Sequence, residues 1–320
     1  MNCLVTGVAG FIGSHLAEKL IGMGHEVIGI DCFTDFYNRK LKENNLENLT
    51  GSSRFTFQEK NLLEIDLEPL MASADYMFHQ AAQAGVRPSW GRNFDTYTKC
   101  NITATHRVLE AATRVKTLKR LVNASSSSVY GDEVAVPMRE DCRPLPVSPY
   151  GVTKLAAENL CHLYWKNYGV PVISLRYFTV YGPRQRPDMA FSKFIKNVLS
   201  KKPIAVYGDG EQTRDFTFVE DAVQANINCM EHGQNGAAYN IGGGSRITVN
   251  GVLKLLGKIS GEKVRIDSQP PQKGDMRHTY ADTSRAQQEL DFRPNVSLEE
   301  GLRREYEWHK GLEHELFILR

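Results

Sequence analysis

The sequence of 320 residues has no long apolar run, no block of like charge and no paired cysteine motif. No apolar stretch approaches the roughly twenty residues that a membrane-spanning helix needs. The first residues already read as a strand and a turn, without the charged segment and apolar core of a signal peptide. These absences predict a soluble protein of the cytoplasm.

Six cysteines occur, but none forms a Cys-x-x-Cys pair or lies at metal-binding spacing from a histidine. We therefore expect free thiols in a reducing compartment and no metal site. The net charge is only +2, and the most basic run, residues 114–120, is interpreted as a solvated helix end and loop. Nucleic acid and membrane are therefore not expected as partners.

Apolar strand-like runs alternate with helix-like stretches through the first half of the chain. This β-α-β alternation predicts a doubly wound (Rossmann) parallel sheet covered on both faces. After residue 176 the rhythm changes, which predicts a first domain at 1–176, whose cofactor is considered next, and a smaller α/β lobe for the substrate at 177–320, with some later segments able to return to the first domain. The expected strands are 2–6, 26–30, 54–58, 76–79, 120–123 and 172–176, and the main helices are 12–23, 96–112 and 149–168.

Three glycines, Gly7, Gly10 and Gly13, stand between the first expected strand and a helix that begins near Ile12. Glycines permit a tight turn and let backbone N–H groups approach a pyrophosphate at the positive end of a helix. Asp31 ends the second strand, where an acid binds the adenosine ribose hydroxyls. No Arg or Lys follows it directly to receive a 2′-phosphate, so NAD is favoured over NADP.

A Tyr-x-x-x-Lys pattern, Tyr150 and Lys154, begins the long helix expected at 149–168. Spacing of four places both side chains on one face of the helix. A tyrosine has an ordinary pKa of about 10, and a neighbouring ammonium together with an oxidised nicotinamide would favour its phenolate. Tyr150 is therefore a candidate general base toward a sugar hydroxyl.

Four serines, residues 125–128, follow the expected strand at 120–123 and precede Val129-Tyr130-Gly131. A hydroxyl at the carboxyl end of a strand is well placed to orient a reacting alcohol beside Tyr150. With this feature the chain resembles the extended short-chain dehydrogenase/reductase family, and within it the nucleotide-sugar epimerases. The matching segments are 6–13, Asp31, 79–82, 125–131, 150–154 and 176–187.

The resemblance implies the residues of an active site and the state of assembly. In the family the catalytic Ser or Thr precedes the tyrosine of Val-Tyr-Gly by four residues, which implies a triad of Ser126, Tyr150 and Lys154, whereas Ser125 is expected to bond locally. A homodimer built on the helices at 96–112 and 149–168 is implied as well. The residues expected at NAD are Gly7, Gly10, Phe11, Ile12, Gly13, Asp31, Asn61, Leu62, Ala81, Ala82, Tyr150 and Lys154.

Ser127 and Ser128 argue against two related activities. Family members that dehydrate nucleotide sugars carry Thr-Asp-Glu before Val-Tyr-Gly, and family decarboxylases of UDP-glucuronate usually carry Thr-Ser-Glu. Serine has no useful pKa with which to replace these acids. Oxidation followed by reduction, that is epimerisation at C4 through a 4-keto sugar, is the reaction that remains.

Segments 31–37, 85–90 and 176–191 are similar to the UDP-glucuronate 4-epimerases. A sugar carboxylate needs hydroxyl, backbone or arginine donors, and a 4-keto uronate, as a β-keto acid, must be held so that it does not lose CO2. Three alternative functions stay open: a UDP-glucose or UDP-N-acetylglucosamine 4-epimerase, a UDP-glucuronate decarboxylase, and an inactive NAD-binding regulator. The arginines expected at the substrate could also be ordinary surface residues without a role in binding. The residues expected at the substrate are Arg87, Ser127, Ser128, Thr179, Arg186, Arg214 and Arg277.

Overall fold

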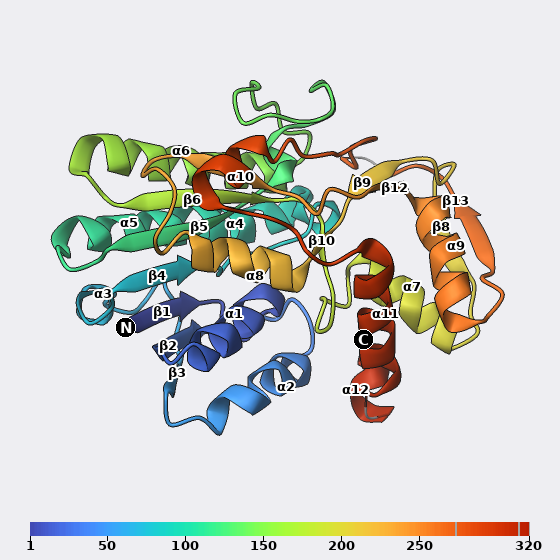
Figure 1. Ribbon diagram of the computed structural model, residues 1–320, viewed down its shortest axis with the longest axis horizontal. Helices are drawn as coiled ribbons and strands as arrows, with labels where there is room; N and C mark the ends of the chain where they lie inside the picture. The colour runs from blue at the N-terminus through green and yellow to red at the C-terminus, as the bar shows by residue number, and fades with distance from the viewer. Residues whose placement is uncertain (273, 313, 320) are drawn as a thin grey trace.

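The computed structural model describes residues 1–272, 274–312 and 314–319. Its centre is a seven-stranded parallel sheet in the order β11-β6-β5-β4-β1-β2-β3 (Figure 1). The order reverses next to β1, which confirms the doubly wound arrangement. Its strands are β1 (Asn2–Thr6), β2 (Glu26–Asp31), β3 (Phe55–Glu59), β4 (Tyr76–His79), β5 (Arg120–Ser126), β6 (Val172–Tyr177) and β11 (Ala238–Ile241).

Helices cover both faces of this sheet and bury two hydrophobic clusters. On one face α1 packs against α8, and Leu16 and Ala222 join the larger cluster. On the other face α5 packs against α6, and Val108 and Cys161 join the second cluster (Figure 1). The helices are α1 (Phe11–Gly22), α2 (Arg39–Thr50), α3 (Glu68–Ala72), α4 (Phe94–Tyr97), α5 (Ala104–Arg114), α6 (Pro149–Tyr168), α8 (Val219–Asn228) and α10 (Ser284–Leu290).

Two elements near the site differ from the sequence-based prediction. Strand β5 extends through Ser126, because its pairing with β6 continues to the Ser126–Tyr177 register. The helix expected at 96–112 is divided into α4, a π-helical segment η3 (Thr98–Thr103) and α5. Helices α2 and α3 were not predicted. The apolar pattern of α2 is interrupted because its buried side includes Lys42 and Asn45, and α3 has only five residues.

A smaller lobe lies at the carboxyl edge of the sheet, at the right of Figure 1. Strand β11 follows residue 176 in the sequence but completes the central sheet beside β6, so the chain crosses between the two parts more than once. The elements outside the central sheet and its layers are β7 (Val180–Tyr181), α7 (Ala190–Leu199), β8 (Ile204–Tyr207), β9 (Thr213–Asp215), β10 (Thr217–Phe218), β12 (Arg246–Thr248), α9 (Val249–Ser260), β13 (Ile266–Gln269), α11 (Leu298–Lys310) and α12 (His314–Ile318), with short turns η1 (Arg87–Ser89), η2 (Gly91–Asn93) and η4 (Ser127–Val129).

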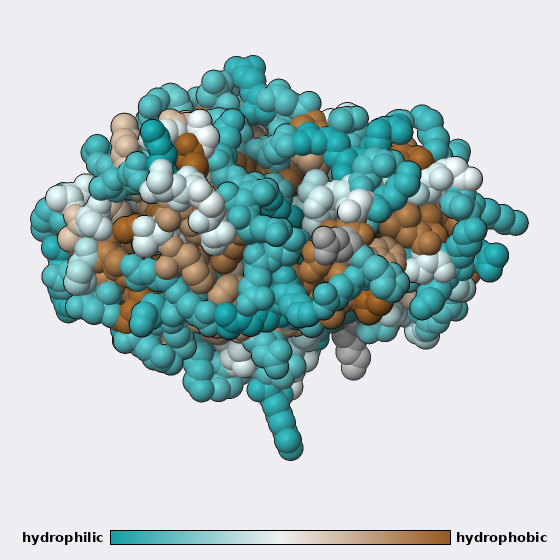
Figure 2. All heavy atoms as spheres, turned by 90° about the horizontal axis from the view of Figure 1, so that it is seen from below, coloured by the Kyte–Doolittle hydropathy of each residue, from teal (hydrophilic) through white to brown (hydrophobic). Residues whose placement is uncertain are grey.

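The surface is mixed in polarity. Apolar side chains reach the lower face in several separate areas among polar ones (Figure 2). In the described part of the chain, no helix is both long and apolar enough to cross a membrane. All six cysteines are free thiols.

Candidate active site

The glycine turn between β1 and α1 is tight because its backbone atoms are in close contact. Gly7 has φ +69°, and a Cβ atom there would lie 2.7 Å from the backbone nitrogen of Ala81. A Cβ atom on Gly13 would lie 2.2 Å from the carbonyl oxygen of Gly7. The first turn of α1 carries no acidic side chain. The bare turn therefore presents a positive helix end that suits a pyrophosphate.

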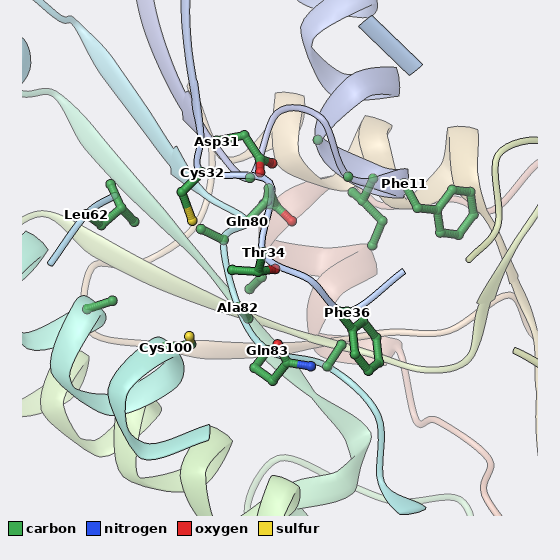
Figure 3. Close-up of a pocket in the computed structure, with 18 of the residues that line it drawn as sticks. Phe11, Asp31, Cys32, Thr34, Phe36, Leu62, Gln80, Ala82, Gln83 and Cys100 are labelled. Carbon is green, nitrogen blue, oxygen red and sulfur yellow. The ribbon is translucent and has the colours of Figure 1, made fainter. Parts of the chain in front are cut away.

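A cavity opens in front of this turn (Figure 3). Asp31 lies at the end of β2, where its carboxylate accepts hydrogen bonds from the backbone N–H groups of Ala9 (3.2 Å) and Phe33 (2.9 Å). Lys42 also lines the cavity, but its ammonium is bound to the carbonyl oxygen of Thr34 at 2.9 Å. The cavity is lined by all twelve residues expected at NAD: Gly7, Gly10, Phe11, Ile12, Gly13, Asp31, Asn61, Leu62, Ala81, Ala82, Tyr150 and Lys154. The residues present therefore fit a dinucleotide.

Tyr150 and Lys154 lie on one face of α6, above the end of β5. Pro149 in the first turn and the Ser148 cap, whose hydroxyl accepts from the backbone N–H of Gly151 at 3.1 Å, fix where this helix begins. The Lys154 ammonium donates to the carbonyl oxygen of Ala124 at 2.8 Å. Burial lowers the pKa of Lys154 to about 8.

The pKa of the Tyr150 phenol is raised by burial, while a hydrogen bond with Ser126 and the charge of Arg186 act to lower it. The sequence assigned that electrostatic role to Lys154, but in the structure Arg186 supplies it. Tyr97 packs edge-on against Tyr150, with ring centroids 6.2 Å apart. Tyr150 therefore lies beside the serine and an aromatic ring, within the electrostatic influence of Arg186.

A second cavity of about 740 Å³ adjoins the first, and both are lined by Tyr150, Ser125 and Arg186. Of the residues expected at the substrate, the structure brings together Arg87, Ser127, Ser128, Thr179, Arg186 and Arg214, and the catalytic candidate Ser126 lines the same cavity. Its volume is that of a site for a sizeable ligand. The shared side chains place a ligand in this cavity directly beside one in the first.

Acidic side chains pair with three of the four arginines expected at the substrate. Arg87 lies 2.7 Å from Asp275 and stacks over the ring of Tyr207. Arg186 lies 2.9 Å from Asp188. Asp275 and Tyr207 had not been identified from the sequence, because only the folded chain brings their loops to the cavity.

Arg214 and Arg277 differ in their surroundings. Arg214 lines the second cavity and donates to the carbonyl oxygen of Thr213 at 2.9 Å, and burial lowers its pKa. Arg277 is half exposed and forms a two-pronged ion pair with Asp209 at 2.9 and 2.7 Å. Arg277 is not among the described residues that line the cavity. Its backbone carbonyl oxygen accepts a hydrogen bond from Arg214 Nη1 at 3.3 Å, so Arg277 adjoins an arginine of the cavity.

No group of three or more His, Cys, Asp or Glu side chains suited to a metal ion occurs among residues 1–272, 274–312 and 314–319. The polar groups that line the two cavities are hydroxyls, amides, lysines, arginines and separate carboxylates. Together, the groups that line the two cavities can bind a dinucleotide and an anionic ligand and can transfer a proton through Tyr150 and Ser126.

Comparison with known proteins supports this chemistry. The model of the NAD dependent epimerase/dehydratase family matches residues 3–242. The structure of UDP-glucuronic acid 4-epimerase from Bacillus cereus, in complex with UDP-glucuronic acid and NAD, superimposes with a TM-score of 0.95 at 44% identity, covering 98% of this chain and 100% of that one.

Two curated relatives match over nearly their whole length. A UDP-glucuronate 4-epimerase from Thermodesulfobacterium geofontis is 39% identical, over 96% of this chain and 95% of the relative. A Bacillus subtilis protein described as the uncharacterized UDP-glucose epimerase YtcB is 46% identical, over 98% and 99%. The family match, these similarities and the paired cavities at the glycine turn agree: the chain belongs to the NAD dependent epimerase/dehydratase family.

Proposed function

We propose that this protein is a UDP-glucuronate 4-epimerase that uses NAD to interconvert UDP-glucuronate and UDP-galacturonate. The observation that carries the proposal is the cavity where Ser126, Tyr150, Thr179 and Arg186 meet. Relatives of similar length and fold carry the name of this activity. When bound, NAD supplies the acceptor and donor of the C4 hydride.

The side chains of this protein handle the proton and the orientation of the sugar. Tyr150 accepts the proton of the C4 hydroxyl, and Ser126, which hydrogen-bonds Tyr150, bridges the two oxygens. Arg186 lowers the cost of the phenolate that results. The configuration at C4 would be inverted when the 4-keto sugar turns over in the cavity, so that hydride returns to the opposite face of C4 while Tyr150 gives the proton back to the C4 oxygen.

The sugar carboxylate fits the hydroxyl-rich wall formed by Ser127, Ser128 and Thr179. Hydroxyls can hold a carboxylate in the plane of the ring, away from overlap with the C4 ketone, without supplying an acid that would assist loss of CO2. The place of the glutamate found in related decarboxylases is taken by Ser128, which disfavours that activity. The diphosphate needs cations, and Arg87 and Arg214 lie on the same cavity.

A neutral UDP-sugar is the second candidate substrate. The B. subtilis relative described as a UDP-glucose epimerase shares 46% of its residues with this chain, which is the observation that favours it. The two candidates differ only in the C6 substituent. An inactive regulator is less well supported, because both Tyr150 and Lys154 are present and adjoin the cavities.

The experiment gives the purified protein UDP-glucuronate, UDP-glucose and UDP-N-acetylglucosamine in separate samples with NAD and follows each anomeric proton by NMR. We expect UDP-galacturonate to appear without pentose and without net NADH. Turnover of a neutral sugar alone would exclude the uronate assignment, and UDP-xylose as the main product would identify a decarboxylase.

We further propose a cytoplasmic homodimer in which α5 and α6 pair with their copies. Leu163 and Tyr168 of α6 expose 51% and 62% of their surface, and an interface between copies of this helix would bury both. Light scattering should give twice the mass of the chain, and Leu163→Glu should give the mass of one chain.

We propose in addition that residues 1–176 form the part that binds the cofactor and residues 177–320 the part that binds the substrate, with β11 added to the sheet of the first part.

A further inference from the structure

Three consecutive residues at the end of β5 are each hydrogen-bonded to a side chain of α6. The three helix residues are spaced four apart and so share one face. The pairs are Ala124 with Lys154, Ser125 with Glu158, and Ser126 with Tyr150. Two of these pairs contain the residues proposed for catalysis, whereas the middle pair, Ser125 with Glu158, has no role in the reaction as described above.

The middle pair is the most firmly held of the three. The Ser125 hydroxyl donates to Glu158 at 2.7 Å, and both side chains are buried. Arg176 of β6 binds the same carboxylate, with Nη2 2.6 Å from it, and the two partners expose only 6% and 10% of their side chains. Arg176 also donates to the hydroxyl of Tyr130 at 2.7 Å. A charged, buried and multiply bonded carboxylate has few alternative positions.

We propose that Ser125 and Glu158 are positioning residues that fix α6 in register with β5 and thereby set the contact between Ser126 and Tyr150. The proposal rests on the proposed function insofar as this contact carries the proton in the reaction. Ser125 stands directly before Ser126 in the strand, and Glu158 lies two helical turns beyond Tyr150. A shift of the helix along the strand would therefore change the Ser126–Tyr150 hydrogen bond first.

The effect of such a shift has a defined sign. The hydrogen bond with Ser126 lowers the pKa of Tyr150 against the opposing effect of burial. Loosening that bond raises the pKa of Tyr150 and moves reacting atoms out of line, and misplacement by about 1 Å can cost about a hundredfold in rate. Binding of the nucleotide part, which depends on other residues, should be unaffected.

The test uses Ser125→Ala, because it leaves Glu158 bound to Arg176 and removes a single hydroxyl. Tyr239→Phe is the matched control. The Tyr239 hydroxyl donates to Glu289 at 2.5 Å, and Glu289 pairs with Arg285, so the control removes the same type of hydroxyl–carboxylate–arginine contact on edge strand β11. Ser125→Thr keeps the hydroxyl and serves as the rescue variant.

Two readouts distinguish positioning from general stability. The first is the pKa of Tyr150, followed by NMR of tyrosine labelled with 13C at Cζ in the NAD-loaded protein and assigned with Tyr150→Phe. The second is the separate effect of each variant on kcat and on KM, measured with whichever UDP-sugar the wild type converts. The NMR readout needs no turnover, so a wrong substrate assignment leaves it intact.

We expect Ser125→Ala to raise the pKa of Tyr150 by at least half a unit and to lower kcat about tenfold, with KM within twofold of wild type. Ser125→Thr should recover most of both, and Tyr239→Phe should change neither. An unshifted Tyr150 pKa, or an equal effect in Tyr239→Phe, would overturn the proposal. If Ser125→Ala does not fold, Ser125→Cys, which fills the space with a weak donor, is measured in its place against the same expectations.

Discussion

Replacing Lys154 with Met should abolish activity while making the protein more stable at neutral pH. The Lys154 side chain is buried, and its ammonium has one bond, to the carbonyl oxygen of Ala124. Burial lowers its pKa from 10.5 to about 8. At about 1.4 kcal/mol per unit, the folded state carries a charge penalty of about 3 kcal/mol below pH 8.

Methionine has a similar length and no charge, so Lys154→Met removes this penalty but leaves the Ala124 carbonyl without its donor. That loss costs about 1 kcal/mol. The net gain in the free energy of unfolding at pH 7 is therefore about 2 kcal/mol. Active-site residues commonly trade stability for function in this way.

The dependence on pH has a definite sign. Between pH 8 and 10.5 the unfolded chain keeps the lysine proton while the folded protein releases it, so the wild type gains stability relative to Lys154→Met as pH rises. Denaturant unfolding of both proteins without added NAD, at pH 7 and pH 10, measures the gap. A variant less stable than wild type at pH 7, or a gap that does not shrink by pH 10, would refute the reasoning.

Three further variants test separate parts of the account. Gly13→Ala places a Cβ atom 2.2 Å from a carbonyl oxygen of the turn, and we expect NAD binding, measured by calorimetry, to weaken at least tenfold. Combining Ser127→Ala with Thr179→Ala removes hydroxyls proposed to hold the carboxylate, and NMR should show more UDP-pentose than wild type forms; an unchanged pentose fraction would reject that role. Arg184 has φ +65°, and its guanidinium lies 2.6 Å from Glu18 of α1. This contact anchors the loop that carries Arg186. Arg184→Ala should therefore raise KM three- to tenfold with little change in NAD binding, whereas equal losses of both would contradict this role.

The features that the sequence predicted are those encoded over short distances. Gly7, Gly10 and Gly13 specify one turn, and Tyr150 and Lys154 specify one helical face. Because parallel strands place their carboxyl ends at one edge of the sheet, these local motifs meet there without further information. The parallel sheet itself follows from the alternation of apolar runs.

The features that sequence reasoning missed depend on contacts between distant segments. The charge of Arg186 acts to lower the pKa of Tyr150 against burial, because the loop after β7 brings Arg186 to the cavity that Tyr150 lines. The Arg277 guanidinium pairs with Asp209, 68 residues away. The spacing of residues within a single helix, strand or loop predicts neither of these two contacts.

Glu158 lies between these two classes. It continues the four-residue spacing of Tyr150 and Lys154, so the pattern Tyr-x-x-x-Lys-x-x-x-Glu could have marked it as a residue on the catalytic face. A buried glutamate on that face requires a cation, and Arg176 at the end of β6 is the one that the fold supplies. Glu158 on the helix therefore pointed to a basic partner such as Arg176 on the neighbouring strand.

The most direct test of the central claim follows a deuterium label at C4 of UDP-glucuronate through turnover in ordinary water. Oxidation and reduction at C4 within one active site predict UDP-galacturonate that retains the deuterium at C4 with inverted configuration, and no pentose. Loss of the label to solvent, or UDP-xylose as the main product, would contradict the account.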